Sequence, residues 1–511
     1  MRKEIIVDCN PYQTRVALLE DGVPCEIYIE RKGRERLLGN IYKGKVQNVL
    51  PGMQAAFVDI GLERNAFLYA GDIQVDRSEF AFDKDQGELP AGDVPNIKDI
   101  VKQGQEIMVQ VFKEPVGTKG ARVTTHVTLP GRSIVLMPTV NYIGVSRRIE
   151  DETERARLKQ VLEQVKPENM GVIVRTAAEG QDMDEFEENL AFLTRLWERI
   201  QQREKILSAP RLIHAEEPLV FRTIRDIFTS DIDRLAVNDA QLYQQVLLVM
   251  EVISPTLKSR VELHESTLDL FDTLGLDQAI EKALARKVWL KNGGYIIIDQ
   301  TEALTSIDVN TGKYTGSNDD LQQTITDTNC AAAREIARQL RLRDISGMLV
   351  IDFIDMDEST DQEKVLETLR SELKRDRTKS NVLGITQLGL VEMTRKKTRP
   401  SLSSTVQMPC PYCGGSGKVL SSESVLLKVR KKLIRAFGEE TFSTYLVKAH
   451  PSVVALIEEN STESFALLPR EPGRQVWVEA VTNSHVQDFS VTHIASKEEL
   501  NYAQSHAKLY A

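Results

Sequence analysis

Two short apolar runs that each end in an aspartate are the feature that most constrains this chain. One run, Thr305-Ser306-Ile307, is closed by Asp308, and the other, 348–351, is closed by Asp352. Short runs of this kind predict buried strands. The segment between them predicts a helix over 331–343. Strand–helix–strand geometry would then bring both aspartates to one edge of a single sheet.

Two carboxylates at neighbouring strand ends would offer a divalent cation a site of hard oxygen ligands. Mg²⁺ is commonly held by one or two protein carboxylates together with substrate phosphates. The alternative is that each aspartate only caps a turn after its strand. Arg338, Arg341 and Arg343 on the intervening helix are expected near the same edge, either holding a phosphate backbone or forming a solvated basic face.

The length and charge of the chain limit its class. With 511 residues it is too long for one core, and three or more compact units are expected. Its 65 Lys and Arg against 75 Asp and Glu give a net charge of −10, so there is no global basic signal for nucleic acid. A local basic track would still suffice. Without a signal peptide or a long apolar run, a soluble, cytoplasmic protein with no membrane partner is expected.

One pair of cysteines has the spacing of a metal knuckle. Cys410 and Cys413 flank Pro-Tyr and precede a glycine-rich turn, which suits two thiolates on one tetrahedral Zn²⁺. A redox pair is the weaker alternative, because no thioredoxin-like context surrounds it. Zinc needs four ligands, and no neighbouring cysteine or histidine in the sequence completes the set. The simplest closure is the same knuckle from a second chain, which would make zinc a dimer link.

Short strands separated by glycine turns over 37–128 indicate a five-stranded OB-type barrel, a common scaffold for single-stranded nucleic acid. Aromatic side chains on such a barrel stack on bases and lysines contact phosphates. A phenylalanine filling the barrel core is the open alternative for Phe57. The expected RNA contacts are Phe57, Phe67, Lys43, Lys45 and Lys113.

A further strand, beginning at Gly171, ends in Arg175 and Thr176. A guanidinium fork, a hydroxyl and backbone amides at a strand end can hold an anion. An arginine that is simply solvated after its strand is the alternative.

Taken together, these segments resemble the ribonuclease E/G family over essentially the whole chain. The matching segments are 40–45, 55–61, 173–177, 300–303, 307–310, 336–343, 351–356 and 410–413. The resemblance is to the short form of the family, which is expected to lack the arginine- and proline-rich scaffold tail of longer members. The segment directly after Asn310 departs from the family pattern.

The resemblance implies a multidomain α+β and α/β fold. The implied parts are an OB-type S1 barrel, a 5′-sensor subdomain, a split RNase H-like subdomain, a DNase I-like catalytic subdomain, a zinc link and a small C-terminal domain. Their expected ranges are 37–128 for the barrel, 129–220 for the sensor, 1–36 and 221–285 for the RNase H-like parts, 286–406 for the catalytic part, 407–417 for the link and 418–511 for the last domain.

The resemblance also implies an activity. Family members are single-strand endoribonucleases that cut A/U-rich RNA, with Mg²⁺ on residues matching Asp308 and Asp352 and an orienting asparagine matching Asn310. They respond to a 5′-monophosphate through residues matching Arg175 and Thr176. They process rRNA precursors and mRNA, and form zinc-linked homodimers that pair into tetramers. Two alternatives are an RNA-binding regulator and a DNA-directed nuclease. The paired aspartates argue against a regulator, and the single-strand barrel argues against a nuclease that acts on DNA.

Overall fold

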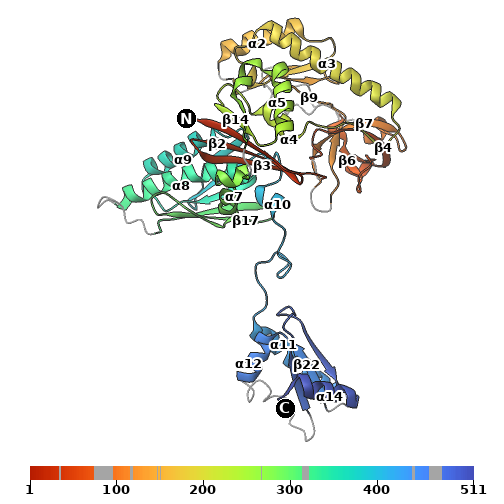
Figure 1. The fold of residues 1–511 in the computed structure, drawn as a ribbon, viewed down its shortest axis with the longest axis vertical. Coiled ribbons are helices and arrows are strands. Elements are labelled where there is room, and N and C mark those ends of the chain that lie inside the picture. Colours follow the sequence, from red (N-terminus) through yellow and green to blue (C-terminus); the bar gives the residue numbers. More distant parts are fainter. Residues whose placement is uncertain are drawn as a thin grey trace. The chain divides into compact units, whose positions relative to one another are not determined.

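The computed structural model describes most of the chain and divides it into two compact units, Met1–Thr405 and Val406–Ala511 (Figure 1). We call them the main unit and the C-terminal unit. The described residues are 1–33, 36–73, 96–115, 119–146, 148–149, 151–265, 268–312, 321–439, 444–459 and 475–510.

The first sheet of the main unit joins two distant parts of the chain. Strand β1 pairs with β2 on one side and, in parallel, with β14 on the other. Residues from the expected ranges 1–36 and 221–285 therefore share one sheet and one apolar core. In spatial order the strands are β15 (Val261–Leu263), β14 (Arg234–Val237), β1 (Lys3–Cys9), β2 (Gln13–Glu20) and β3 (Val23–Arg31).

The second sheet closes into a barrel, because β4 pairs with both β5 and β7. Small residues, among them Ala55, Ala56 and Ala66, are fully buried where the strands approach one another. Strand β13, from the range expected to belong to the neighbouring subdomain, adds to β4 at the edge. The strands are β13 (Arg211–His214), β4 (Ile41–Leu50), β5 (Ala55–Asp59), β6 (Ala66–Tyr69), β8 (Arg122–Thr124) and β7 (Glu106–Lys113).

The third sheet is small and is packed by two amphipathic helices. Both helices begin at an aspartate N-cap, Asp151 for α2 and Asp182 for α3, whose carboxylate accepts a backbone N–H of the first turn. The elements are β11 (Ile143–Val145), β12 (Gly171–Val174), β10 (Ile134–Met137), β9 (Leu129–Pro130), α2 (Glu152–Val165) and α3 (Met183–Ile206).

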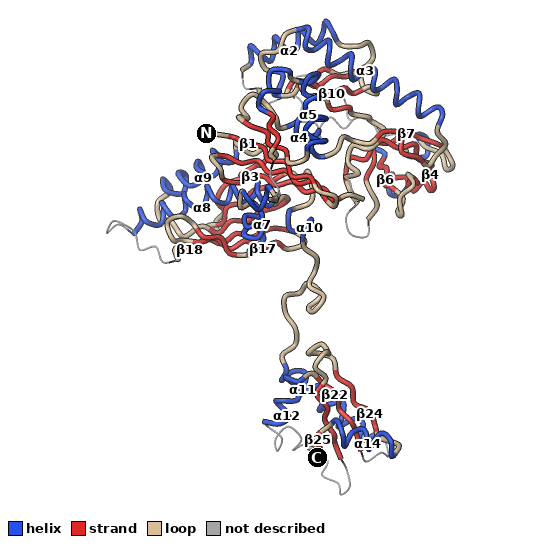
Figure 2. Tube along the Cα trace, viewed as in Figure 1, coloured by secondary structure: helices blue, strands red, loops and turns tan. Residues whose placement is uncertain are grey.

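The fourth sheet carries the two aspartates, and helices α8 and α9 cover one of its faces (Figure 2). Along β18, Thr305, Ile307 and Val309 are buried while the residues between them are exposed, the alternation of a strand covered on one side. The elements are β16 (Lys287–Trp289), β17 (Tyr295–Gln300), β18 (Leu304–Asn310), β19 (Gly347–Asp352), β21 (Leu390–Arg395), β20 (Ser380–Ile385), α8 (Leu321–Arg343) and α9 (Ser359–Leu373).

Helix α8 starts ten residues before the expected 331, at Leu321. The sequence signal was weak there because threonine and asparagine disfavour helix interiors. In the structure, Thr326 and Thr328 donate their hydroxyls to carbonyls one turn earlier, and Asn329 bonds both backbone groups of Ile354. These buried polar groups are therefore satisfied within the fold.

The expectation for the arginines of α8 was wrong. Arg341 is buried and pairs with Glu20 and Glu26 of the N-terminal sheet, against which α8 packs. Arg338 pairs with Glu335, and Arg343 is buried with its Nε bonded to Gln339. Helical periodicity separated these arginines from the apolar positions of α8 but could not show that a second sheet packs against the helix at Arg338 and Arg341.

A buried ion cluster follows α8 at the start of β19. Arg395 donates to Asp376 at 2.6 Å and to Asp344 at 2.7 Å, and all three side chains are almost fully buried. Arg399 also pairs with Asp344. The cluster joins the end of α8 to β21 and to the segment that follows it.

The C-terminal unit has its own core, in which buried residues of the two helices α11 and α12 pack against a sheet. Its elements are α11 (Ser422–Glu439), β22 (Thr444–Ala449), α12 (Pro451–Glu459), β23 (Gln475–Ala480), β24 (Phe489–His493), α14 (Lys497–His506) and β25 (Lys508–Leu509).

The remaining α-helices connect the sheets. They are α1 (Ile97–Ile100), α4 (Leu219–Asp226), α5 (Ala240–Ile253), α6 (Leu270–Thr273), α7 (Leu276–Leu284) and α10 (Leu402–Val406). Across the described ranges, no helix combines the length and the hydrophobicity that spanning a membrane would require.

We predict that Asp376→Ala strongly destabilises the main unit. It leaves the Arg395 guanidinium buried with only one of its two carboxylate partners, and breaking a buried pair in this way costs about 3–5 kcal/mol. Urea denaturation followed by circular dichroism measures the loss. Arg370→Ala, which breaks an exposed pair with Glu363, is the control and should cost at most about 1 kcal/mol. Equal losses in both variants would contradict the structural role of the cluster.

Candidate active site

The two aspartates are direct neighbours on parallel strands. Strands β18 and β19 pair so that Asp308 is opposite Asp352. Both side chains lie on the sheet face opposite α8 and α9 and are exposed. The strands are thus buried on one face only, and the carboxylates stand on an open surface where a polymer can reach them.

Asn310 lies two residues beyond Asp308 on the same face. Its Nδ2 donates to Asp308 Oδ2 at 2.8 Å, so the amide fixes the orientation of that carboxylate. Partial burial, the charge of Asp308 and then that of Asp355 raise the pKa of Asp352. The adjacent negative charges repel one another, and a bound cation would relieve this repulsion.

These residues fit a hard divalent cation. They offer carboxylate oxygens from two rigid strands and leave most of a coordination sphere to water and phosphate, as Mg²⁺ prefers. Asp308 and Asp352 would be the ligands and Asn310 would orient the first of them. Among the described residues no group of three or more His, Cys, Asp or Glu is arranged to hold a metal. Residues 313–320, in the segment after Asn310, lie outside the described ranges.

The aromatic residues expected on the barrel lie side by side. Phe57 on β5 pairs with Phe67 on β6, with ring centroids 5.9 Å apart in an edge-on arrangement. Both rings are half-buried, so neither is simply a core residue. Phe67 is next to Arg122 on β8, which in turn is opposite Lys113 on β7.

The three lysines differ in their surroundings. Lys45 and Lys113 are exposed. Lys43 is mostly buried, and its ammonium donates to the Glu204 carbonyl at 2.9 Å and pairs with Glu106 at 3.2 Å. Its charge is therefore already engaged at the contact between β4 and the end of α3.

Sequence reasoning missed Phe112 and Arg122. A bulge in β7 between Val111 and Lys113 brings Phe112 under the Arg122 guanidinium, 5.1 Å from the ring centroid. Asp72 holds the same guanidinium through two hydrogen bonds of 2.7 and 2.8 Å. The bulge has no signature in the sequence, so only the alternation of aromatic and basic residues in β7 could have hinted at this contact.

Arg175 and Thr176 follow β12, as expected. Arg175 donates through Nη1 to the Gly131 carbonyl at 2.8 Å and to Asp226 at 2.7 Å. Asp226 is also held by a two-point contact with Arg225. Burial opposes ionisation of Asp226, but Arg225 and then Arg175 lower its pKa. Thr176 is exposed at the start of the short 3₁₀ helix η3 (Thr176–Ala178).

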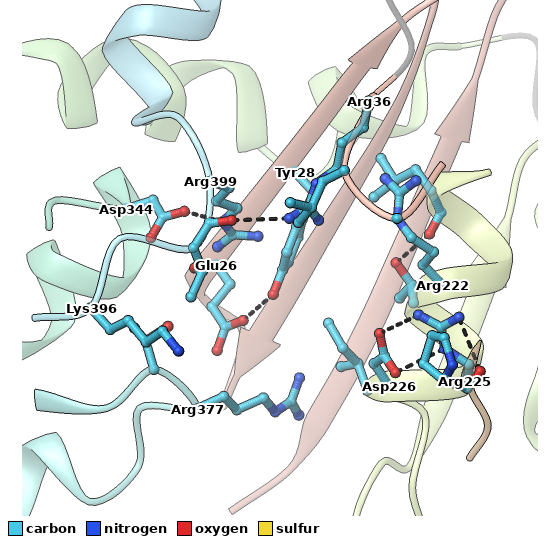
Figure 3. A pocket seen from close by; sticks show the side chains of 18 of the residues that line it. Glu26, Tyr28, Arg36, Arg222, Arg225, Asp226, Asp344, Arg377, Lys396 and Arg399 are labelled. Atoms are coloured by element: carbon cyan, nitrogen blue, oxygen red, sulfur yellow. Dashed lines mark hydrogen bonds and ion pairs between the residues drawn. The ribbon is translucent and has the colours of Figure 1, made fainter. Parts of the chain in front are cut away.

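Both residues line a large cleft of about 1060 Å³ within the main unit. Arginines and lysines outnumber carboxylates along its walls, although the chain as a whole is acidic. Arg225 and Asp226 line one part of it and Arg377 and Arg399 another, with strand β3 between them (Figure 3).

The floor of the cleft is densely charged. Glu26 and Tyr28 on β3 are hydrogen-bonded, and the Arg399 guanidinium lies 3.7 Å from the centroid of the Tyr28 ring (Figure 3). Burial alone would raise the pKa of Glu26, but Arg377, Arg341 and Arg399 lower it to about 2. These groups stabilise one another and also make the cleft attractive to anions.

The cysteine knuckle lies in the C-terminal unit and is shaped to hold thiolates. The Gly417 N–H donates to Cys413 Sγ at 3.3 Å, and the N–H groups of Gly417 and Gly415 lower the pKa of the Cys413 thiol. Gly414, Gly415 and Gly417 all have positive φ, which other residues adopt with strain. Cys410 and Cys413 thus fit half of a tetrahedral zinc site.

His485, far from the knuckle in sequence, supports it in space. The rings of His485 and Tyr412 are 4.2 Å apart, His485 Nε2 lies 2.6 Å from the Tyr412 carbonyl, and the Val486 N–H donates to the Tyr412 hydroxyl. No sequence pattern linked these residues, because their contact depends on the fold of the C-terminal unit.

Comparisons with known proteins agree with this architecture. A profile of the ribonuclease E/G family matches residues 128–398, and one of the S1 RNA binding domain matches 38–125. Ribonuclease G of Escherichia coli (strain K12) is 41% identical over 96% of this chain and 99% of its own length. Ribonuclease G of Haemophilus influenzae is 42% identical with the same coverage. Ribonuclease E of Escherichia coli (strain K12) is 36% identical over 93% of this chain but 44% of its own length.

The fold and the comparisons define a multidomain, mixed α/β protein in which an S1 barrel is joined to a ribonuclease E/G domain. The chain belongs to the ribonuclease E/G family.

We predict that Phe67→Ala weakens binding of an unstructured RNA. Stacking is worth roughly 1–3 kcal/mol per base, so the dissociation constant should rise about tenfold or more. Fluorescence anisotropy with a labelled oligonucleotide measures it. Phe192→Ala removes an exposed ring from α3 and is the matched control. A folded Phe67→Ala protein with unchanged affinity would show that this ring does not contact RNA.

Proposed function

We propose that this chain is a Mg²⁺-dependent, single-strand-specific endoribonuclease that cuts A/U-rich RNA in the cytoplasm and acts in rRNA maturation and mRNA decay. Its family membership makes it an endoribonuclease, a hydrolase acting on RNA. The observation that carries the assignment of the site is the register of Asp308 beside Asp352 on an open sheet face.

In this proposal each part of the site has a distinct role. Asp308 and Asp352 hold the cation, and Asn310 keeps the Asp308 carboxylate in place. A Mg²⁺ ion held there would supply an activated water and neutralise charge on the scissile phosphate. In sequence, no histidine lies near either aspartate, which disfavours a histidine-based attack by the 2′-hydroxyl. The S1 barrel holds the single strand through Phe57, Phe67, Lys45 and Lys113. Lys43 contributes least to RNA binding, because its ammonium is already paired with Glu106.

The cleft at Arg175 and Thr176 is proposed to bind the 5′-monophosphate of the substrate. Within the described residues, both hydrogen bonds of the Arg175 side chain come from Nη1, so the Nη2 edge of the guanidinium remains for an incoming phosphate. Binding there raises cleavage by proximity and leaves the chemical step unchanged.

Zinc is proposed as a link between two chains. Cys410 and Cys413 supply two of four ligands, and the same pair from a second copy would supply the rest. The split RNase H-like, 5′-sensor and DNase I-like subdomains expected from the family are part of the same proposal.

The metal pair is tested by Asp308→Asn and Asp352→Asn. Each variant keeps the shape of the side chain and removes one charge from a cation site, so cleavage should fall roughly 100-fold or more while RNA binding persists. Glu392→Gln is the matched control, since Glu392 is exposed on the same sheet face one strand from Asp352. Near-normal cleavage by either asparagine variant rules out the assignment.

Arg175→Ala should erase the preference for 5′-monophosphorylated over 5′-hydroxyl RNA and leave the rate on 5′-hydroxyl RNA nearly intact. Folding should survive, because Asp226 keeps its two-point contact with Arg225. Initial rates on the two RNAs measure the effect. Arg157→Ala, which breaks an ion pair on α2, is the control. If the preference persists in Arg175→Ala, the phosphate binds elsewhere.

Cys413→Ser should release zinc and shift dimers towards monomers, because a hydroxyl is a poor replacement for a thiolate ligand. Metal analysis of the wild type should give about one zinc per two chains, as two thiolates per chain require. Sedimentation analysis reports the assembly, with Cys9→Ser as a control outside the knuckle. One zinc per chain, or a Cys413→Ser protein that stays assembled, contradicts a shared site.

A further inference from the structure

A cluster of one lysine and two aromatic residues lies beside the aspartates. Lys287 and Trp289 are on β16, and Tyr295 is on β17. Lys287 is opposite Ile297, which is opposite Asp308, and Trp289 is opposite Tyr295. Directly paired residues project to the same side of a sheet.

The cluster therefore shares the open face with the aspartates and Asn310, which is opposite Tyr295. Neighbouring strands are about 4.8 Å apart, so the backbone of Lys287 is roughly 10 Å from that of Asp308. This separation places the cluster next to the reacting position but outside the cation site.

The geometry inside the cluster is specific. The Lys287 ammonium lies 4.0 Å from the centroid of the Trp289 ring and 3.5 Å from that of Tyr295, and the two rings meet edge-on at 5.4 Å. The rings hold the cation in place through its attraction to their faces. Within the described part of the chain Lys287 makes no ion pair with a carboxylate, so its charge is not neutralised there.

Trp289 is 59% exposed, although tryptophan is usually largely buried. An exposed indole next to an oriented ammonium has the two properties that single-stranded nucleic acid requires, a flat surface for a base and a positive charge for the backbone. The charge also offsets repulsion between the aspartates and an approaching polyanion.

We propose that Lys287, Trp289 and Tyr295 form a nucleotide-binding subsite beside the metal pair. Trp289 stacks on a base flanking the cleavage position, and Lys287, oriented by Tyr295, contacts a neighbouring phosphate. The subsite rests on the proposed function, because it positions RNA for the cut made at Asp308 and Asp352.

The test uses the full-length protein and an unstructured, 5′-hydroxyl A/U-rich RNA. Trp289→Ala should raise the KM of cleavage about tenfold with little change in kcat, since the ring binds RNA away from the reacting atoms. Trp289→Phe keeps an aromatic face and should stay within about threefold of the wild-type KM. Lys287→Gln should raise the KM and make binding less sensitive to salt.

Tryptophan fluorescence gives a second measurement. In a non-cleaving Asp308→Asn background, RNA should quench the emission. The additional change Trp289→Phe should remove most of the quenching while RNA still binds. Trp477→Phe, in the C-terminal unit, should leave the quenching in place.

Three outcomes overturn the subsite. One is an unchanged KM in Trp289→Ala, and another is quenching that survives Trp289→Phe. The third is a loss of self-association in Trp289→Ala without a change in RNA affinity, which would mean that a second copy of the chain covers this face. If the wild-type protein itself neither binds nor cuts the RNA, the proposed function fails, and this result is distinct from the other three.

Discussion

The parallel register between β18 and β19 is the constraint on which the site depends. It places Asp308 opposite Asp352, and a slip of one residue in either strand would turn its aspartate into the helix-covered face. The register is held from that covered face, where Ile307 and Ile351 are packed under α8 and α9. The apolar core on one face of the sheet thus determines the distance between Asp308 and Asp352 on the other face.

The same sheet connects the aspartates to the charged cleft. Asp352 is at one end of β19, and Gly347, at the other end, is opposite Arg395, which lines the cleft. Strand geometry makes this separation roughly 17 Å. If the proposed function holds, strand β19 fixes the distance between the cleft that anchors the RNA and the aspartates that cut it. The buried Arg395–Asp376 pair at the cleft end helps to keep that element fixed.

Local patterns predicted the parts of the fold that follow from periodicity and spacing. Strand–helix–strand order was enough to expect Asp308 near Asp352, and glycine-separated strands were enough to expect the barrel that carries Phe57 and Phe67. Contacts between distant segments were not predictable. Arg341 was misjudged because its partners, Glu20 and Glu26, are more than 300 residues earlier. The position of Phe112 depends on the bulge in β7, and that of Trp289 depends on the pairing of β16 with β17. The contact between His485 and Tyr412 depends on the fold of the C-terminal unit.

In the proposed mechanism, Asp308 and Asp352 together hold the cation of the reaction. Crystals of the protein soaked in Mn²⁺, which shares the oxygen-ligand preference of Mg²⁺, test it most directly through anomalous scattering. We expect one strong manganese peak in the main unit, within coordination distance of both carboxylates, and its loss in Asp352→Asn crystals. A peak bound to only one aspartate, or a strong site elsewhere with none between these two, would contradict it.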